Sequence, residues 1–217
     1  MINTVLFDLD GTLTNSKEGI LNCVRYALEK LHHPIPDPET LFRFIGPPLG
    51  DSFRQWCGMD EAESRRAVEI FRERYRPVGM FENAPGPGCV DLCRRLWKRG
   101  LTLAVASSKP ESMCVPICER FGFAPYMRTI VGSPPGDDWN KTQVITEALS
   151  RLGRADGDSS VLMVGDRKYD VLGAAAHGLP CVGVEFFGYA EAGELESAGA
   201  AAVVQTAEEL EAYILSH

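Results

Sequence analysis

The sequence predicts an α/β fold in which a doubly wound parallel sheet carries an inserted helical domain. Short, almost continuously apolar runs recur along the chain, as expected of strands buried on both faces of a parallel sheet. Helical stripes of apolar residues follow the later runs, and strands that alternate with helices are typical of doubly wound folds. The chain has 217 residues, more than one typical domain, which leaves room for an insertion.

Five strands are expected, in an order that fits this architecture. A helical stripe that starts at Val144 follows the third strand, and another that starts at Val171 follows the fourth. Each strand, together with the helix that follows it, is one repeating unit of a doubly wound fold. The expected strands are residues 4–7, 101–106, 129–131, 161–164 and 180–184.

Residues 8–100 interrupt this alternation, because they contain helix signals and no convincing strand. Asn15 with Glu18, and Asp60 with Glu63, have the spacing of a capping box at the start of a helix. We therefore expect a helical module of residues 15–82 inserted into an α/β core. The core would consist of residues 1–14 and 83–217.

Composition and charge exclude several classes of protein. The chain carries 30 acidic and 22 basic residues, and a net charge of −8 disfavours binding to nucleic acid. Its apolar runs are far shorter than the ~20 residues of a membrane span. The N-terminus meets Asp8 without a basic start, unlike a secretory signal. The seven cysteines fit reduced thiols, so a cytoplasmic location is expected.

Polar residues follow four of the expected strands, at the edge of the sheet where open α/β folds bind ligands. Carboxylates follow the first and the fourth strand, hydroxyls the second, and an ammonium group the third. These groups are therefore expected to converge in space. They are Asp8 and Asp10, then Ser107 and Ser108, then Lys141, and finally Asp166 and Asp170.

This set of side chains suits phosphoryl transfer. Crowded carboxylates are costly unless a cation neutralises them, and a site of oxygen ligands suits magnesium. Lysine and serine can donate to phosphate oxygens. A carboxylate can attack phosphorus and form an aspartyl-phosphate, which divides one hard hydrolysis into two easier steps.

The motifs Asp8-x-Asp10-Gly-Thr, Ser107, Lys141 and Gly165-Asp166-x-x-x-Asp170 resemble the four ordered motifs of the haloacid dehalogenase-like (HAD) phosphatase superfamily. The helical insertion resembles the cap domain of that superfamily. The resemblance implies that Asp8 is the nucleophile and Asp10 the general acid/base. It also implies phosphate binding by Ser107, Ser108 and Lys141. Asp8, Asp10 (through its backbone carbonyl), Asp166 and Asp170 would hold magnesium (Mg2+) as the cofactor.

Within the superfamily, the segments Phe44–Leu49 and Gly188-Tyr189 resemble a phosphoglycolate phosphatase-like or 5'-nucleotidase-like subgroup. The expected substrate is a small phosphomonoester, with a nucleoside monophosphate preferred over phosphoglycolate. A sugar-phosphate mutase and a phospho-aspartate receiver module stay open as alternatives. Lys109 competes with Lys141 for the phosphate. The chain is expected to act as a monomer or homodimer.

Overall fold

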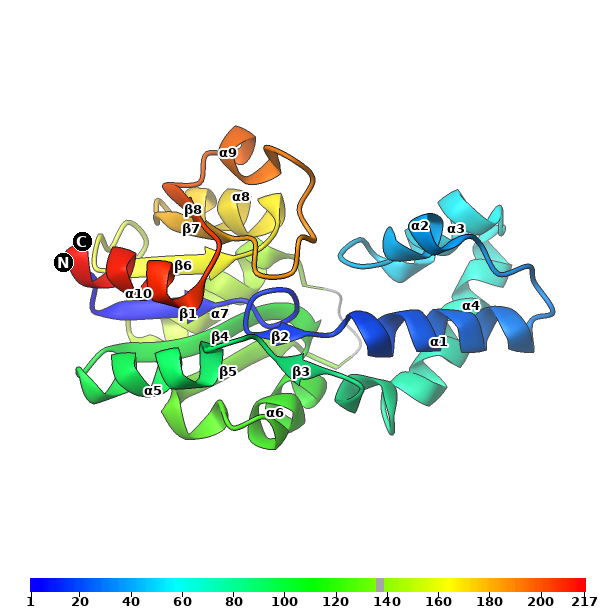
Figure 1. Cartoon of the computed structure of the whole chain (residues 1–217), viewed down its shortest axis with the longest axis horizontal. Helices are drawn as coiled ribbons and strands as arrows, with labels where there is room; N and C mark the ends of the chain where they lie inside the picture. Colours follow the sequence, from blue (N-terminus) through cyan, green and yellow to red (C-terminus); the bar gives the residue numbers. More distant parts are fainter. Residues whose placement is uncertain (136–138) are drawn as a thin grey trace. The chain divides into compact units, whose positions relative to one another are not determined.

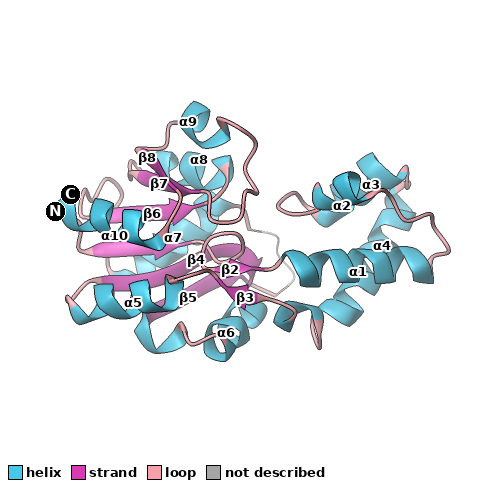
Figure 2. Ribbon diagram, viewed as in Figure 1, coloured by secondary structure: helices cyan, strands magenta, loops and turns pink. Residues whose placement is uncertain are grey.

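The computed structural model describes residues 1–135 and 139–217 of the chain. These residues divide into two compact units, one of Met1–Asn15 with Pro85–His217 and the other of Ser16–Ala84. Figure 1 follows the chain through both units, and Figure 2 separates their helices from their strands. Within the described ranges, every helix is too short or too polar to span a bilayer.

The larger unit is built on a six-stranded parallel sheet with the order β5-β4-β1-β6-β7-β8. The chain adds strands on one side of β1 and then returns to add the others on the opposite side, so the order reverses between β1 and β6. This arrangement confirms the predicted fold class. The strands are β1 (Thr4–Phe7), β4 (Thr102–Pro110), β5 (Met127–Ser133), β6 (Val161–Gly165), β7 (Cys181–Val184) and β8 (Ala202–Val204).

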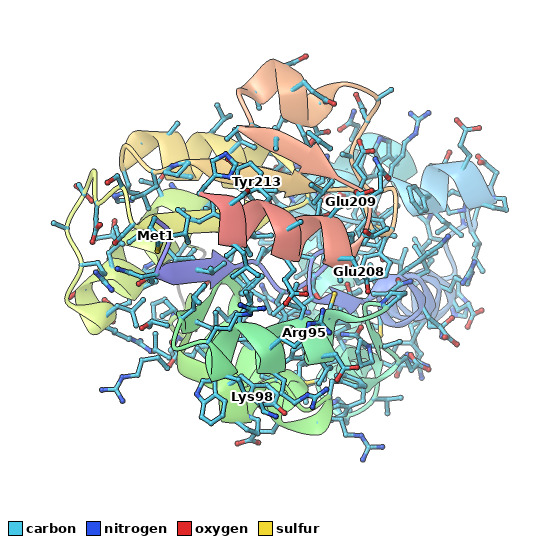
Figure 3. The ribbon with its side chains drawn as sticks, turned by 60° about the vertical axis from the view of Figure 1, so that its left-hand side comes forward. Met1, Arg95, Lys98, Glu208, Glu209 and Tyr213 are labelled. Atoms are coloured by element: carbon cyan, nitrogen blue, oxygen red, sulfur yellow. The ribbon has the colours of Figure 1, made fainter. Side chains whose placement is uncertain are left out.

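Helices cover both faces of the sheet. The helices α7 (Lys141–Leu152) and α8 (Lys168–Ala176) share one buried apolar cluster with side chains of β1, β4, β5, β6 and β7. On the other face, α5 (Cys89–Lys98) contacts α10 (Ala207–Ser216), and Arg95 pairs with Glu211 at 2.8 Å (Figure 3). The short helix α9 (Glu194–Ala198) packs on α8, while α6 (Glu111–Arg120) and the 3-10 turn η2 (Ala124–Tyr126) lie between β4 and β5 in the chain.

The smaller unit is helical, and α4 packs against both α1 and α3. Asp60 and Glu63 form the predicted capping box at the start of α4. The side chain of Arg74 binds both oxygens of Glu82, at 2.6 and 2.8 Å, and so ties the end of α4 to the segment that follows. The elements are α1 (Lys17–Lys30), α2 (Pro38–Phe42), α3 (Leu49–Cys57), α4 (Glu61–Tyr75) and the 3-10 turn η1 (Gly79–Phe81).

Three details differ from the sequence-based expectation. The region expected to lack strands contains a two-stranded ribbon of β2 (Thr14–Asn15) and β3 (Ala84–Pro85), which are too short to leave a pattern of apolar residues. Helix α1 begins after Ser16 without a side-chain cap, so the capping box predicted at Asn15 was wrong. The strand β8 was also missed, because it has only three residues, and so short a run leaves no clear strand pattern.

Gly19 in α1 allows a close approach of two backbone segments in the smaller unit. A Cβ at this position would lie 1.9 Å from the carbonyl oxygen of Gly79. The Gly19 N–H also donates to the carbonyl of Glu82 over 2.9 Å. Alanine gains up to ~1 kcal/mol of helix propensity over glycine, but a backbone clash costs more.

We therefore predict that Gly19→Ala lowers the free energy of unfolding by about 2 kcal/mol, as overpacking typically does. The measurement is denaturant unfolding followed by circular dichroism. Gly50→Ala in α3 is the matched control, since a Cβ there meets only the flexible end of Arg54 at 3.8 Å. Equal effects of the two substitutions would contradict the proposed close contact.

Candidate active site

The carboxyl ends of β1 and β6 form the centre of the candidate site. Asp8 follows β1, and its N–H donates to the carbonyl of Val164 over 2.9 Å, which extends the pairing of the two strands. Asp166 is the first residue after β6. Because the strand order reverses between β1 and β6, this is the position at which open α/β sheets bind ligands.

The loop after β1 turns back at Gly11 and packs on Asp166. The φ angle of Gly11 is 85°, in the left-handed region that favours glycine. A Cβ on Gly11 would lie 2.1 Å from Oδ2 of Asp166, so the position also lacks space for a side chain. The hydroxyl of Thr12 donates to Oδ1 of Asp166 over 3.2 Å. The loop therefore holds the Asp166 carboxylate from two sides.

Asp8, Asp166 and Asp170 form a cluster in which one oxygen of each lies within 4.8 Å of the others. Asp166 is 3% exposed and Asp170 is 1% exposed. Oδ2 of Asp170 accepts the N–H of Arg167 over 3.1 Å at the start of α8, which fixes its carboxylate. Buried oxygens of this kind can hold a divalent cation such as magnesium, which would neutralise their mutual repulsion.

Lys141 supplies the positive charge of this cluster. It is the first residue of α7, whose start is fixed by a capping box of Asn140 and Gln143. Its Nζ lies 2.7 Å from Oδ1 of Asp8 and 2.8 Å from Oδ1 of Asp170. Nζ also donates a hydrogen bond to the carbonyl of Ala106 over 3.0 Å.

The pKa values of Asp166, Asp170 and Lys141 are all raised, through different balances of burial and neighbouring charge. Burial, followed by repulsion from Asp170 and Asp8, raises the pKa of Asp166 well above its ordinary value. Burial also raises the pKa of Asp170, although Lys141 partly offsets this. Burial disfavours the charge of Lys141, but attraction to Asp170 and Asp8 outweighs it and raises the pKa of Lys141. The cluster thus holds a permanent cation beside carboxylates that are costly to ionise.

The remaining candidate residues lie around this cluster. Ser107 is buried within β4, the strand beside β1, whereas Ser108 is exposed; β4 runs to Pro110, so both serines lie inside the strand and not after it as expected. The carboxylate of Asp10 does not join the three-carboxylate group found in the described ranges. Its Oδ2 instead lies 2.7 Å from Nζ of Lys109. Lys109 and Lys141, the two candidates for binding the phosphate, therefore face different carboxylates.

Tyr189, named above only for the subgroup resemblance, also contacts this region. Its ring packs against Gly11, where an added Cβ would lie 2.7 Å from Cδ2. Its hydroxyl donates to Oδ1 of Asn15 over 2.6 Å. Tyr189 therefore contacts both the loop after β1 and the strand β2 that follows this loop. A Gly-Tyr pair is too common a signal to reveal such a contact by itself.

Comparisons with known proteins find a family profile, related sequences and a similar solved structure. The sequence profile of the haloacid dehalogenase-like hydrolases matches residues 5–184. A 5'-nucleotidase of Pseudomonas aeruginosa is 41% identical over 194 residues, which are 89% of this chain and 86% of the relative. The tyrosine-protein kinase PtkA of Mycobacterium tuberculosis is 35% identical, over 94% of this chain and 68% of the kinase.

A solved structure described as a predicted phosphatase from Clostridium acetobutylicum is similar over the whole length of both chains. It has a TM-score of 0.90 and 40% sequence identity. At 40% identity, the two chains are similar in sequence as well as in fold. The fold of this chain is therefore shared by a chain described as a predicted phosphatase.

We predict that Asp166→Asn stabilises the metal-free protein, because it removes one of three neighbouring carboxylate charges and keeps an acceptor for Thr12. In the presence of EDTA, the midpoint of thermal unfolding should rise by about 3 °C, or ~1 kcal/mol for a domain of this size. Asp91→Asn is the control, since Asp91 forms only an exposed pair with Arg94. A midpoint lowered by Asp166→Asn would contradict the repulsion argument.

Proposed function

The chain belongs to the haloacid dehalogenase-like hydrolases, and from this premise we propose that it is a magnesium-dependent phosphatase that works through an aspartyl-phosphate. The observation that carries the proposal is the position of Asp8. Its carboxylate lies beside one buried ammonium group and two further carboxylates, at the ligand-binding edge of the sheet. This combination serves a nucleophile that must approach a phosphate dianion.

Asp8 and Asp10 perform the bond-making steps of the proposed reaction. A carboxylate oxygen of Asp8 attacks phosphorus, the ester P–O bond breaks, and the leaving oxygen takes a proton from Asp10. A water molecule then attacks the phosphorus of the aspartyl-phosphate and gives a proton to Asp10. The acyl-phosphate P–O bond breaks, inorganic phosphate leaves, and the Asp8 carboxylate is restored.

The other candidate residues bind the phosphate and the cation. Lys141, with Ser107 and Ser108, donates to phosphate oxygens. Magnesium would be held by Asp8, Asp166 and Asp170 together with the backbone carbonyl of Asp10, and when bound it would neutralise charge on the phosphoryl group. The clustering of three carboxylate oxygens within 4.8 Å supports this ligand set.

A nucleoside monophosphate is the proposed substrate. The support is the 41% identity to a 5'-nucleotidase over 89% of this chain. Phosphoglycolate is the runner-up, on the subgroup resemblance of the sequence. Both are small alkyl phosphates, so both need a proton donor for the leaving oxygen, and the same two aspartates serve either substrate.

Removal of the proposed nucleophile gives the first test. Asp8→Asn should reduce kcat/KM by at least about 1,000-fold, the scale seen when a covalent nucleophile is lost. The midpoint of thermal unfolding should not fall, because the substitution removes one of three neighbouring negative charges and so reduces their repulsion. Phosphate release and calorimetry measure the two quantities. Near-normal turnover by this variant, relative to the surface control Asp91→Asn, would rule out Asp8 as the nucleophile.

A panel of phosphomonoesters assayed with and without magnesium tests the cofactor and the substrate class together. We expect EDTA to abolish phosphate release and added magnesium to restore it. Nucleoside monophosphates should give higher kcat/KM values than phosphoglycolate. Turnover that persists in EDTA would contradict the magnesium proposal, while a preference for phosphoglycolate would reverse the substrate assignment and leave the chemistry intact.

A further inference from the structure

Lys109 and Asp10 form an ion pair at the edge of the candidate site. Nζ of Lys109 lies 2.7 Å from Oδ2 of Asp10, and the two side chains are 9% and 24% exposed. Lys109 comes from β4 and Asp10 from the loop after β1, and these two strands are neighbours in the sheet. A pair this well shielded is less weakened by solvent than the surface pairs of the chain.

A bulge in β4 determines where Lys109 points. Ala106 is opposite Val131 and Pro110 is opposite Ser133, so three residues of β4 face one residue of β5. Bulges of this kind re-aim side chains next to functional sites. The extra residues change the direction of the side chains that follow Ala106. The bulge therefore presents Lys109 toward the loop that carries Asp10.

Contacts from β5 and α6 fix this bulge. A Cβ on Gly132 would lie 2.5 Å from the carbonyl oxygen of Lys109, so the two backbones are in direct contact there. The hydroxyl of Ser133 donates to the carbonyl of Ser108 over 2.5 Å. The thiol of Cys114 donates to the carbonyl of Lys109 over 3.5 Å. The backbone of Lys109 is thus held from two neighbouring elements.

We propose that Lys109 is a positioning residue that holds the Asp10 carboxylate in place for proton transfer to the leaving oxygen. The inference rests on the role of Asp10 in the proposed function. The other carboxylate oxygen of Asp10, Oδ1, is buried and makes no hydrogen bond within the described residues. The ion pair with Lys109 therefore restrains this carboxylate at its other oxygen, and small displacements of a catalytic group are costly.

A dependence on the leaving group distinguishes this role from phosphate binding. The ratio kcat/KM reports the steps up to cleavage of the ester bond. An alkyl phosphate needs a proton at its leaving oxygen, whereas p-nitrophenyl phosphate releases a stable anion. Loss of a residue that positions the proton donor therefore lowers kcat/KM only for the alkyl ester. A residue that binds the phosphate affects both esters, because the phosphate group is common to them.

The experiment compares Lys109→Met with wild type on p-nitrophenyl phosphate and on adenosine 5'-monophosphate, or on the alkyl ester that the panel finds best. We expect kcat/KM to fall about 10- to 100-fold for the alkyl ester, part of the 100- to 10,000-fold that general acid catalysis supplies, and by less than about 3-fold for the aryl ester. Lys98→Met is the matched control, since Lys98 lies exposed on α5 (Figure 3).

A double variant supplies the second test. If Lys109 acts through Asp10, Asp10→Asn with Lys109→Met should be no worse on the alkyl ester than Asp10→Asn alone. Lys109→Gln should reproduce the pattern of Lys109→Met, and thermal unfolding checks that each variant is folded.

Equal losses on both esters with a raised KM, or additive losses in the double variant, would overturn the positioning role. These outcomes differ from a failure of the proposed function. That failure would appear as no hydrolysis of either ester by the wild type, or as an active Asp8→Asn variant, and it would remove both proposals together.

Discussion

The buried ammonium group of Lys141 is the interaction on which the candidate site depends. It lies within 2.8 Å of oxygens of Asp8 and Asp170, and the oxygens of these two residues and Asp166 crowd within 4.8 Å. Without a cation at this position, three carboxylates at the centre of a sheet edge would be strongly destabilising. The same charge is suited to a phosphate, so the group that stabilises the acidic cluster is also the one proposed to bind the phosphate.

The sheet topology explains how residues distant in the chain reach this cation. Asp8 and Asp166 follow β1 and β6, which are paired and between which the strand order reverses. Lys141 begins α7 and Asp170 lies in the first turn of α8, and both helices pack on one face of the sheet. Parallel strands bring their carboxyl ends to one edge, so each winding unit contributes to a single cluster.

In this phosphatase, two lysines form ion pairs with different carboxylates. Lys141 faces Asp8 and Asp170, while Lys109 faces Asp10. The proposed nucleophile and the proposed proton donor are only two residues apart in sequence, and they must act at opposite sides of a phosphorus atom. Separate counter-charges keep their environments different, which is how paired carboxylates acquire distinct roles.

Local sequence was sufficient for the fold class, for five strands of the sheet and for the capping box at Asp60, because apolar runs and capping residues leave patterns within a few positions. It also indicated the residues of the acidic cluster, since those follow buried strands. The short ribbon of β2 and β3 and the three-residue strand β8 left no such pattern. Sequence could not decide which carboxylate each lysine faces. That depends on the bulge after Ala106 and on the packing of Gly11 against Asp166, which are contacts between distant segments and arise only in the folded chain.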